Sequence, residues 1–209
     1  IEIKKYTLLT KIGKKKKSTQ VGEKKWKSNK QSGQPHSGYY TQAQIKEIVN
    51  YAAQRHITIV PEIEMPGHSS AAVAADPWLG TENKQIEVPV KFGRFYDIYD
   101  VTNPRVTICI EDVLQEVFSL FPSKVIHIGG DEVSYDAWTK SSKVKTYMEK
   151  NNLKTYADLQ VHFTNGISRF IEKKDRRMMG WNEIMGINIH PDFEEKKTDE
   201  NAETSLAKN

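Results

Sequence analysis

The stretch VIHIGGDEV, residues 125–133, decides how this chain folds. It opens with an apolar run that is typical of a buried strand, and the glycine pair 129–130 then allows the backbone to turn sharply. Two adjacent carboxylates, Asp131 and Glu132, follow the turn. Enzymes with parallel α/β sheets place their chemistry at this carboxyl edge. An acidic pair can equally cap the next helix, so the neighbouring segments have to decide between the two interpretations.

Three segments carry the apolar spacing of amphipathic helices. Thr41 and Gln44 have the spacing of a capping box, and the helix behind them should end near residues 55–56. A second helix is expected to start around Cys109, and Thr155 opens the third. The apolar positions of the three are Ile45, Ile48, Val49 and Ala52; Ile110, Val113, Leu114, Val117 and Leu120; and Leu159, Phe163, Ile167, Phe170 and Ile171.

Each of these helices is followed by an apolar segment that predicts a strand: ITIVPEI at 57–63, VIHI at 125–128 and RMMGW at 177–181. The first is too apolar to be half exposed, so we expect a parallel strand covered on both faces. Residues 1–12 hint at a fourth strand. Helix followed by strand, three times over, predicts a parallel sheet with right-handed crossovers.

The residues suited to chemistry collect at the carboxyl ends of these strands, at 62–68, 131–132 and 181–183. This is the α/β pattern of the (β/α)₈ TIM barrel, whose active site lies on one face. Eight strands with their helices usually need about 250 residues. We therefore expect a partial barrel, with residues 1–209 forming a fragment of one catalytic barrel domain.

Two segments without clear periodicity, 13–38 and 76–108, are predicted to be long loops. The chain beyond Asp192 is polar, except that residues 202–209 are expected to begin another helix. The composition is that of an ordinary globular domain, 37% hydrophobic and 28% charged. No apolar run approaches the roughly 18 residues of a membrane span, and no signal-peptide pattern is present. The single cysteine excludes an intrachain disulfide and is expected to be a buried helix residue.

The net charge of +4 conceals an uneven distribution. Residues 1–30 hold 11 lysines and two glutamates, a balance of +9, so the remaining residues carry −5. A basic segment of this kind can bind nucleic acid. However, residues 14–17 lie among glycine, serine and threonine, without an aromatic platform or a recognisable nucleic-acid-binding fold. We therefore predict a solvated loop and no nucleic-acid partner.

Three motifs together resemble one known enzyme family. HIGGDEV at 127–133, PEIEMPGH at 61–68 and GWNEI at 180–184 are similar to the catalytic barrel of glycoside hydrolase family 20, the β-N-acetylhexosaminidases. The motifs occur in the family's order and are separated by helix-length segments. The resemblance extends over residues 1–209, and it implies that the chain corresponds to about strands 3–5 of that barrel.

The resemblance implies a retaining, substrate-assisted hydrolysis. Ordinary glycosidases hold two carboxyl groups roughly 5–9.5 Å apart across the scissile bond, which suits sequence neighbours poorly. In family 20 the 2-acetamido carbonyl of the sugar attacks its own anomeric carbon, and water then opens the oxazolinium intermediate. The implied substrates are glycans with a terminal β-linked N-acetylglucosamine or N-acetylgalactosamine. The reaction needs no cofactor and no metal, and the family is expected to be periplasmic or secreted.

The same resemblance assigns roles to five residues. Glu132 is expected to be the general acid that protonates the leaving oxygen and then the base that activates water. Asp131 is expected to hold the acetamido N–H and to stabilise the oxazolinium charge. His68 is expected to tune the acid through a relay whose carboxylate partner precedes residue 1. Trp181 is expected to line the acetamido pocket, and Glu183 to accept a substrate hydroxyl.

Other interpretations of these positions stay open. His68 could be an ordinary loop residue and Trp181 a core residue at a strand end. His127 alternates with two isoleucines and is expected to lie in the barrel interior. Glu64 stands where the family motif has aspartate, and its extra methylene is expected to change the local geometry.

Two further functions compete with the hexosaminidase. The family's substrate-binding arginine and the other acetamido-pocket aromatics are expected outside residues 1–209, so the chain could be a truncated, catalytically inactive remnant with at most weak sugar binding. A metal-dependent barrel hydrolase could use His68, His127, Asp131 and Glu132. No HxH or HExxH spacing supports such a metal site. The oligomeric state is not predicted.

Overall fold

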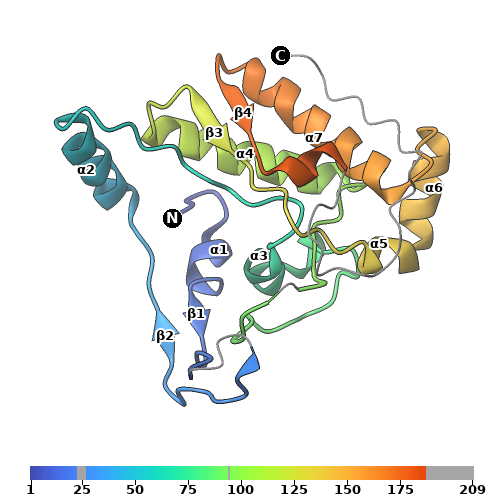
Figure 1. Ribbon diagram of the computed structural model, residues 1–209, viewed down its shortest axis with the longest axis horizontal. Coiled ribbons are helices and arrows are strands. Elements are labelled where there is room, and N and C mark those ends of the chain that lie inside the picture. Colours follow the sequence, from blue (N-terminus) through green and yellow to red (C-terminus); the bar gives the residue numbers. More distant parts are fainter. Residues whose placement is uncertain (23–26, 94, 187–209) are drawn as a thin grey trace.

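The structure is a computed structural model that describes residues 1–22, 27–93 and 95–186. It is a mixed α/β arrangement in which helices surround a short parallel sheet (Figure 1). The helices are α1 (Thr7–Lys11), α2 (Gln42–Ala53), α3 (Ser70–Ala75), α4 (Pro104–Leu120), α5 (Asp136–Lys140), α6 (Ser142–Lys150) and α7 (Tyr156–Glu172), with 3₁₀ turns η2 (Pro77–Leu79) and η3 (Asn182–Met185). The strands are β1 (Lys15–Lys16), β2 (His36–Ser37), β3 (Val125–His127) and β4 (Arg177–Met179).

Strand β3 is hydrogen-bonded on both of its edges. On one edge it pairs in parallel with β4, with His127 opposite Met179. On the other edge it bonds to residues 61–65: the Ile63 N–H donates to the His127 carbonyl at 2.9 Å, and the Met65 N–H donates to the Ile128 carbonyl at 3.0 Å. All three segments run in the same direction, so their carboxyl ends meet at one edge, as the sequence predicts.

The first predicted strand, 57–63, does not form as expected. It is joined to β3 by a single bridge, Glu62 to His127, and two of its apolar side chains are exposed, Ile57 by 57% and Val60 by 39%. Among the described residues no strand pairs with its outer edge. The exposed side chains also show that the segment is not covered along its whole length. The predicted fourth strand in residues 1–12 is wrong, because residues 7–11 form helix α1.

The closed barrel is likewise not formed by the residues that the structure describes. The parallel sheet consists of two short strands and the bridged segment beside them, which is far fewer than the eight strands of a closed barrel. The structure therefore supports the α/β class and a part of a barrel. The predicted loop 13–38 contains a short antiparallel pair, β1 with β2, and the predicted helix at 202–209 lies outside the described residues.

Two of the three predicted helices begin as expected, and the other begins early. The Thr41 capping box opens α2, and Thr155 caps α7 with Asp158 as its partner. Helix α4 starts at Pro104 rather than near Cys109, because Asn103 caps it and proline is favoured in the first turn. The predicted loop 76–108 is correspondingly shorter and contains η2. Helices α5 and α6 were not predicted.

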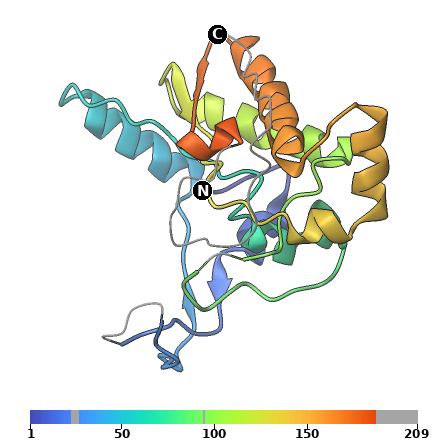
Figure 2. The ribbon, with the colours of Figure 1, turned by 45° about the vertical axis from the view of Figure 1, so that its right-hand side comes forward.

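The hydrophobic core lies between the parallel sheet and helices α4 and α7, which lie beside it in both views (Figures 1 and 2). Ile126 and Ile128 of the strand segment, Leu114 of α4 and Ile167 of α7 are fully buried. The cysteine, Cys109, is buried on α4, which confirms the prediction for it. None of the described helices has the length and apolarity that crossing a membrane requires.

The open sheet edges lead to a prediction for residues 1–209 expressed alone. Within the described residues the outer edges of β4 and of segment 57–63 have no pairing partner, and Met179 is 42% exposed beside them. Unpaired strand edges template association between chains. We expect the isolated chain to self-associate and to melt without a cooperative transition. Size-exclusion chromatography and thermal denaturation test this, and a monomer with a sharp melting transition would contradict it.

Candidate active site

The site forms where three turns follow the three parallel segments. The turn after residues 61–65 approaches the turn after β3 so closely that a Cβ on Gly67 would lie 3.3 Å from the Asp131 carbonyl oxygen. The turn after β4 is tied to them by the Trp181 N–H, which donates to the Gly129 carbonyl at 2.9 Å. The pairing of the sheet therefore brings all three sequence motifs together.

One histidine contacts both members of the acidic pair. The Nε2 atom of His68 lies 3.5 Å from Oδ2 of Asp131 and 3.5 Å from Oε2 of Glu132. His68 and Glu132 have positive φ angles of 49° and 50°, a conformation that is uncommon for residues other than glycine. Such backbone strain is concentrated at functional sites. It lets two adjacent carboxylates face the same imidazole ring, each with its side chain partly exposed.

The contact between His68 and Asp131 sets the charge of both groups. The hydrogen bond from His68 lowers the pKa of Asp131 below its ordinary value, although burial opposes this shift. The same hydrogen bond raises the pKa of His68, again against the effect of burial. Asp131 is therefore held as a carboxylate near neutral pH, with the protonated form of His68 favoured beside it. This pairing uses Nε2 of His68, and the carboxylate partner expected before residue 1 remains a prediction.

A third carboxylate, that of Glu62, contacts the residues on the other side of the site. Its Oε1 atom lies 2.9 Å from Nδ1 of His127 and accepts a hydrogen bond from the Trp181 indole at 3.2 Å. The two rings meet edge to face, 5.0 Å apart. The Nδ1 atom of His127 is also 3.0 Å from the Gly129 nitrogen. It donates to Glu62 if protonated and accepts from Gly129 if not, so it cannot make both bonds at once.

Glu64 lies beneath the turn that carries the acidic pair. A Cβ built on Gly129 would be 1.8 Å from Oε2 of Glu64, so the carboxyl group occupies the space where a side chain would be. Burial and then the charge of Asp131 raise the pKa of Glu64 to about 7. Gly129 also has a φ of 67°, which favours glycine. The extra methylene of Glu64 thus extends its carboxyl into a gap that Gly129 leaves.

The glutamine of α7 that supports these turns was missed by the sequence analysis. Gln160 is buried, and its amide donates to the carbonyls of Gly130 at 2.9 Å and Glu183 at 3.3 Å. Its own oxygen accepts from the Tyr135 hydroxyl at 2.7 Å. The signal was available, because polar residues at four-residue spacing lie next to the apolar face of this helix: Gln160, Thr164 and Ser168.

The two predicted residues after β4 have different surroundings. Trp181 is 50% exposed, so it is not the core tryptophan that the alternative interpretation describes. Glu183, on η3, is only 7% exposed, so a substrate hydroxyl would have little access to its carboxyl group. His127 is buried within the sheet, as predicted.

Three of the four residues of the alternative metal site come together. His68, Asp131 and Glu132 offer donor atoms that all lie within 4.8 Å of one another, while His127 points to Glu62 instead. The predicted set of four metal ligands is therefore not assembled. The same three donor atoms are engaged in the contacts between imidazole and carboxylates described above.

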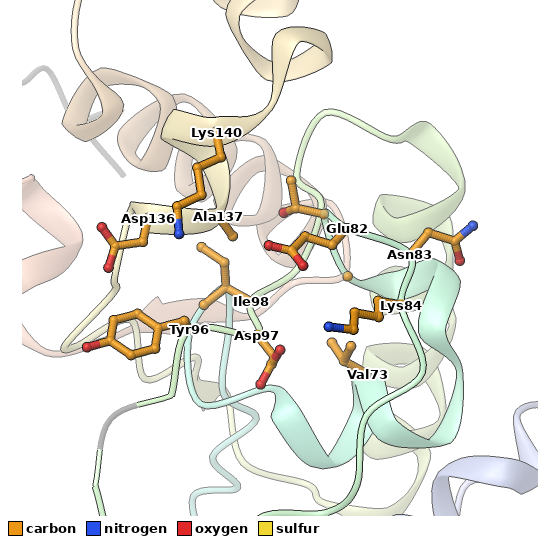
Figure 3. A pocket seen from close by; sticks show the side chains of 12 residues that line it. Val73, Glu82, Asn83, Lys84, Tyr96, Asp97, Ile98, Asp136, Ala137 and Lys140 are labelled. Atoms are coloured by element: carbon orange, nitrogen blue, oxygen red, sulfur yellow. The ribbon is translucent and has the colours of Figure 1, made fainter.

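A pocket lies near the segment that carries His68 (Figure 3). Its lining combines the apolar side chains of Val73, Ile98 and Ala137 with charged groups of both signs from Glu82, Lys84, Asp97, Asp136 and Lys140. The backbone of Asp97 connects it to the site, because its carbonyl oxygen is 3.4 Å from the hydroxyls of Ser69 and Ser70. This pocket thus borders the segment that carries His68.

Comparison with known proteins gives consistent matches. The model of the glycosyl hydrolase family 20 catalytic domain matches residues 1–202. A β-hexosaminidase of Porphyromonas gingivalis is 39% identical over 191 residues, which are 91% of this chain and 23% of that protein. The β-N-acetylhexosaminidase structure from Bacteroides fragilis matches with a TM-score of 0.71 at 36% identity, over 88% of this chain and 33% of that one.

A further solved relative contains a sugar. The exo-β-N-acetylglucosaminidase of Vibrio harveyi, in complex with N-acetylglucosamine, matches with a TM-score of 0.72 at 32% identity. The match covers 90% of this chain and 29% of that one. The chain thus spans about a quarter to a third of the length of these relatives.

The tight contact at Gly129 predicts the effect of a single methyl group. In the protein that carries residues 1–209, Gly129→Ala should lower the free energy of unfolding by about 1–3 kcal/mol or more. Alanine is strained at the positive φ of this position, and its methyl group would displace the Glu64 carboxyl. For a domain of this size that corresponds to a fall in Tm of at least about 2–4 °C per kcal/mol.

A matched control for this change is Gly166→Ala, inside α7, where nothing lies within 4 Å of the added methyl. Alanine is the better helix former by about 1 kcal/mol, so Tm should stay the same or rise. Thermal denaturation of both variants tests the prediction, and equal Tm values for the two would contradict it.

Proposed function

The chain belongs to glycosyl hydrolase family 20, and we propose that it provides the acid–base part of the active site of a β-N-acetylhexosaminidase. The substrate is a glycan with a terminal β-linked N-acetylglucosamine or N-acetylgalactosamine. The reaction is retaining and substrate-assisted, through an oxazolinium intermediate. Since the chain spans only part of its relatives, the proposal concerns the protein that carries residues 1–209.

The observation that carries this proposal is the contact of one imidazole with two adjacent carboxylates. A residue pair leaving a single turn can address two neighbouring atoms of a substrate, one through each carboxyl group. Asp131 and Glu132 both face His68, whose Nε2 atom lies 3.5 Å from an oxygen of each. This arrangement suits a reaction in which one carboxyl moves a proton while the other remains an anion.

Asp131 is proposed to be the group that remains an anion. The hydrogen bond from His68 lowers its pKa, so it can stabilise the positive charge that develops on the oxazoline ring. Its second oxygen, Oδ1, is buried and has no hydrogen-bond partner among the described residues. An acetamido N–H would satisfy that acceptor, which would otherwise cost free energy.

Glu132 is proposed to be the proton donor. In the first step it protonates the glycosidic oxygen as the 2-acetamido carbonyl oxygen attacks the anomeric carbon and the bond to the leaving group breaks. In the second step it takes a proton from the water that opens the oxazolinium. His68, whose pKa is raised by Asp131, provides the neighbouring positive charge.

Trp181 is proposed to hold the sugar itself. Its indole is half exposed and fixed by Glu62, so it offers an aromatic face in a defined orientation. The Vibrio harveyi relative binds N-acetylglucosamine, which supports this class of ligand here. The predicted contact of Glu183 with a substrate hydroxyl remains part of the proposal. It requires the buried carboxyl to become accessible when substrate binds.

The role of Glu132 predicts a dependence on the leaving group. Glu132→Gln should reduce kcat/KM on natural disaccharides by a factor of about 10² to 10⁴, because proton donation is lost. The loss should be much smaller on aryl N-acetylglucosaminides with acidic phenols, which leave without protonation. Steady-state kinetics on both substrates measures this, and equal losses would remove Glu132 from the acid role.

The same assays separate the competing functions. Turnover that EDTA abolishes would favour the metal-dependent hydrolase, and sugar binding without any hydrolysis would favour the inactive remnant.

The role of Asp131 predicts a loss of affinity for an intermediate mimic. A thiazoline analogue of the oxazolinium should bind at least about 10²-fold tighter than N-acetylglucosamine, as mimics of reactive species do. Asp131→Asn should remove most of that advantage and leave affinity for the product sugar nearly unchanged. Inhibition constants for the two ligands test this, and a thiazoline that binds no better than the sugar would exclude the substrate-assisted mechanism.

A further inference from the structure

The side chains of Glu62, His127 and Trp181 meet at the carboxyl end of the parallel sheet. Glu62 and His127 are partners in the bridge between segment 61–65 and β3, so their side chains emerge on the same face of neighbouring segments. Trp181 comes from the third segment, two residues after Met179, which pairs with His127 on its other edge. The sheet register therefore joins side chains that are up to 119 positions apart in the chain.

Trp181 is restrained at three points. Its main-chain N–H donates to the Gly129 carbonyl at 2.9 Å, which fixes where the side chain begins. Its indole N–H donates to Oε1 of Glu62 at 3.2 Å, and its ring meets the imidazole of His127 edge to face at 5.0 Å. The residue is nevertheless 50% exposed. A free side chain in this position would have to be ordered when a ligand binds, and these contacts order it beforehand.

The contact between Glu62 and His127 shows where a proton belongs. Nδ1 of His127 lies 2.9 Å from the same Oε1 atom that accepts the indole N–H. An unprotonated Nδ1 would face this oxygen lone pair to lone pair, whereas an Nδ1–H group donates to it. Hydrogen bonds to a carboxylate are roughly twice as strong as those between neutral groups, so this bond outweighs the competing one from the Gly129 N–H.

We propose, on the basis of the hexosaminidase function proposed above, that Glu62 and His127 are positioning residues for the sugar-binding tryptophan. His127 donates its Nδ1 proton to a hydrogen bond with Glu62, and Glu62 holds the indole N–H of Trp181. The aromatic ring is thereby set before a terminal β-linked N-acetylhexosamine arrives. Neither positioning residue touches the sugar or the reacting atoms, so the pair acts on binding and not on proton transfer.

The first test separates binding from chemistry. In the protein that carries residues 1–209, Glu62→Ala should raise KM for an aryl N-acetylglucosaminide about 2- to 10-fold, the range of one net hydrogen bond, with kcat nearly unchanged. The side chain of Glu62 is 41% exposed, so its truncation leaves no buried cavity. Glu62→Gln keeps an oxygen that accepts both N–H groups and should restore KM. The matched control is Glu87→Ala, which removes an exposed carboxyl paired with Lys17 and should change neither constant.

A double-mutant cycle tests whether the effect passes through the indole. Trp181→Phe keeps an aromatic ring and removes the N–H that Glu62 accepts. Adding Glu62→Ala to Trp181→Phe should therefore raise KM no further, because two residues that act through one bond are not additive.

Two measurements do not depend on hydrolysis. In protein labelled with nitrogen-15, the indole N–H of Trp181, identified by its loss in Trp181→Phe, should exchange with solvent faster in Glu62→Ala than in wild type or Glu62→Gln. The imidazole resonances of His127, identified as those that shift in Glu62→Ala, should show the proton on Nδ1 in wild type.

Each outcome decides the proposal. Additive effects of Glu62→Ala and Trp181→Phe, or a loss in kcat in place of KM, would overturn the role of Glu62. An unprotonated Nδ1, or imidazole resonances that do not respond to Glu62→Ala, would overturn the role of His127. If wild type shows no hexosaminidase activity, the proposed function fails, and the indole exchange rates still decide whether Glu62 holds Trp181.

Discussion

The two-sided hydrogen bonding of β3 is the constraint on which the site depends. Bonds to β4 on one edge and to residues 61–65 on the other align three chain segments in one direction. Parallel alignment brings the ends of segments that are far apart in sequence to one edge. The distance between His68 and Glu132 is thus set by backbone pairing, and the side chains need only short turns to meet.

Charge balance is the second condition for the site. Four carboxyl groups, those of Glu62, Glu64, Asp131 and Glu132, lie around the same turns with two imidazoles. Not all of them can be anions near neutral pH in partly buried surroundings. The environment separates them: His68 favours the anionic form of Asp131, and burial favours the neutral form of Glu64. Carboxyl groups whose pKa values are driven apart can take different roles in one reaction.

The sequence predicted the elements that local rules determine. Helix α7 begins at Thr155 and its apolar stripe is buried, because the capping box and the 3.6-residue period both lie within the helix itself. The strand at 125–128 and the turn after it were also predictable, since an apolar run followed by two glycines leaves few alternatives. The same holds for the meeting of His68 with the acidic pair, which follows from three parallel segments.

The features that were missed depend on contacts distant in sequence. The burial of segment 57–63 was overestimated. An apolar sequence shows that burial would be favourable, but it does not show which other segments pack against it. The start of α4 was placed too late, because the apolar stripe outweighed the Asn103 cap. The contact of Glu64 with Gly129 joins residues 65 positions apart and leaves no periodic trace in the sequence.

Gln160 has an implication for how this site could change in evolution. It supports the turns after β3 and β4 through carbonyl groups of the main chain, at Gly130 and Glu183. Every residue type has such a carbonyl, so the support does not depend on which side chain stands at position 183. The side chain at position 183 can therefore change while this support of the turn stays in place. A buried glutamine bound to main-chain carbonyls thus makes the shape of the site independent of the residue types in the turns that it supports.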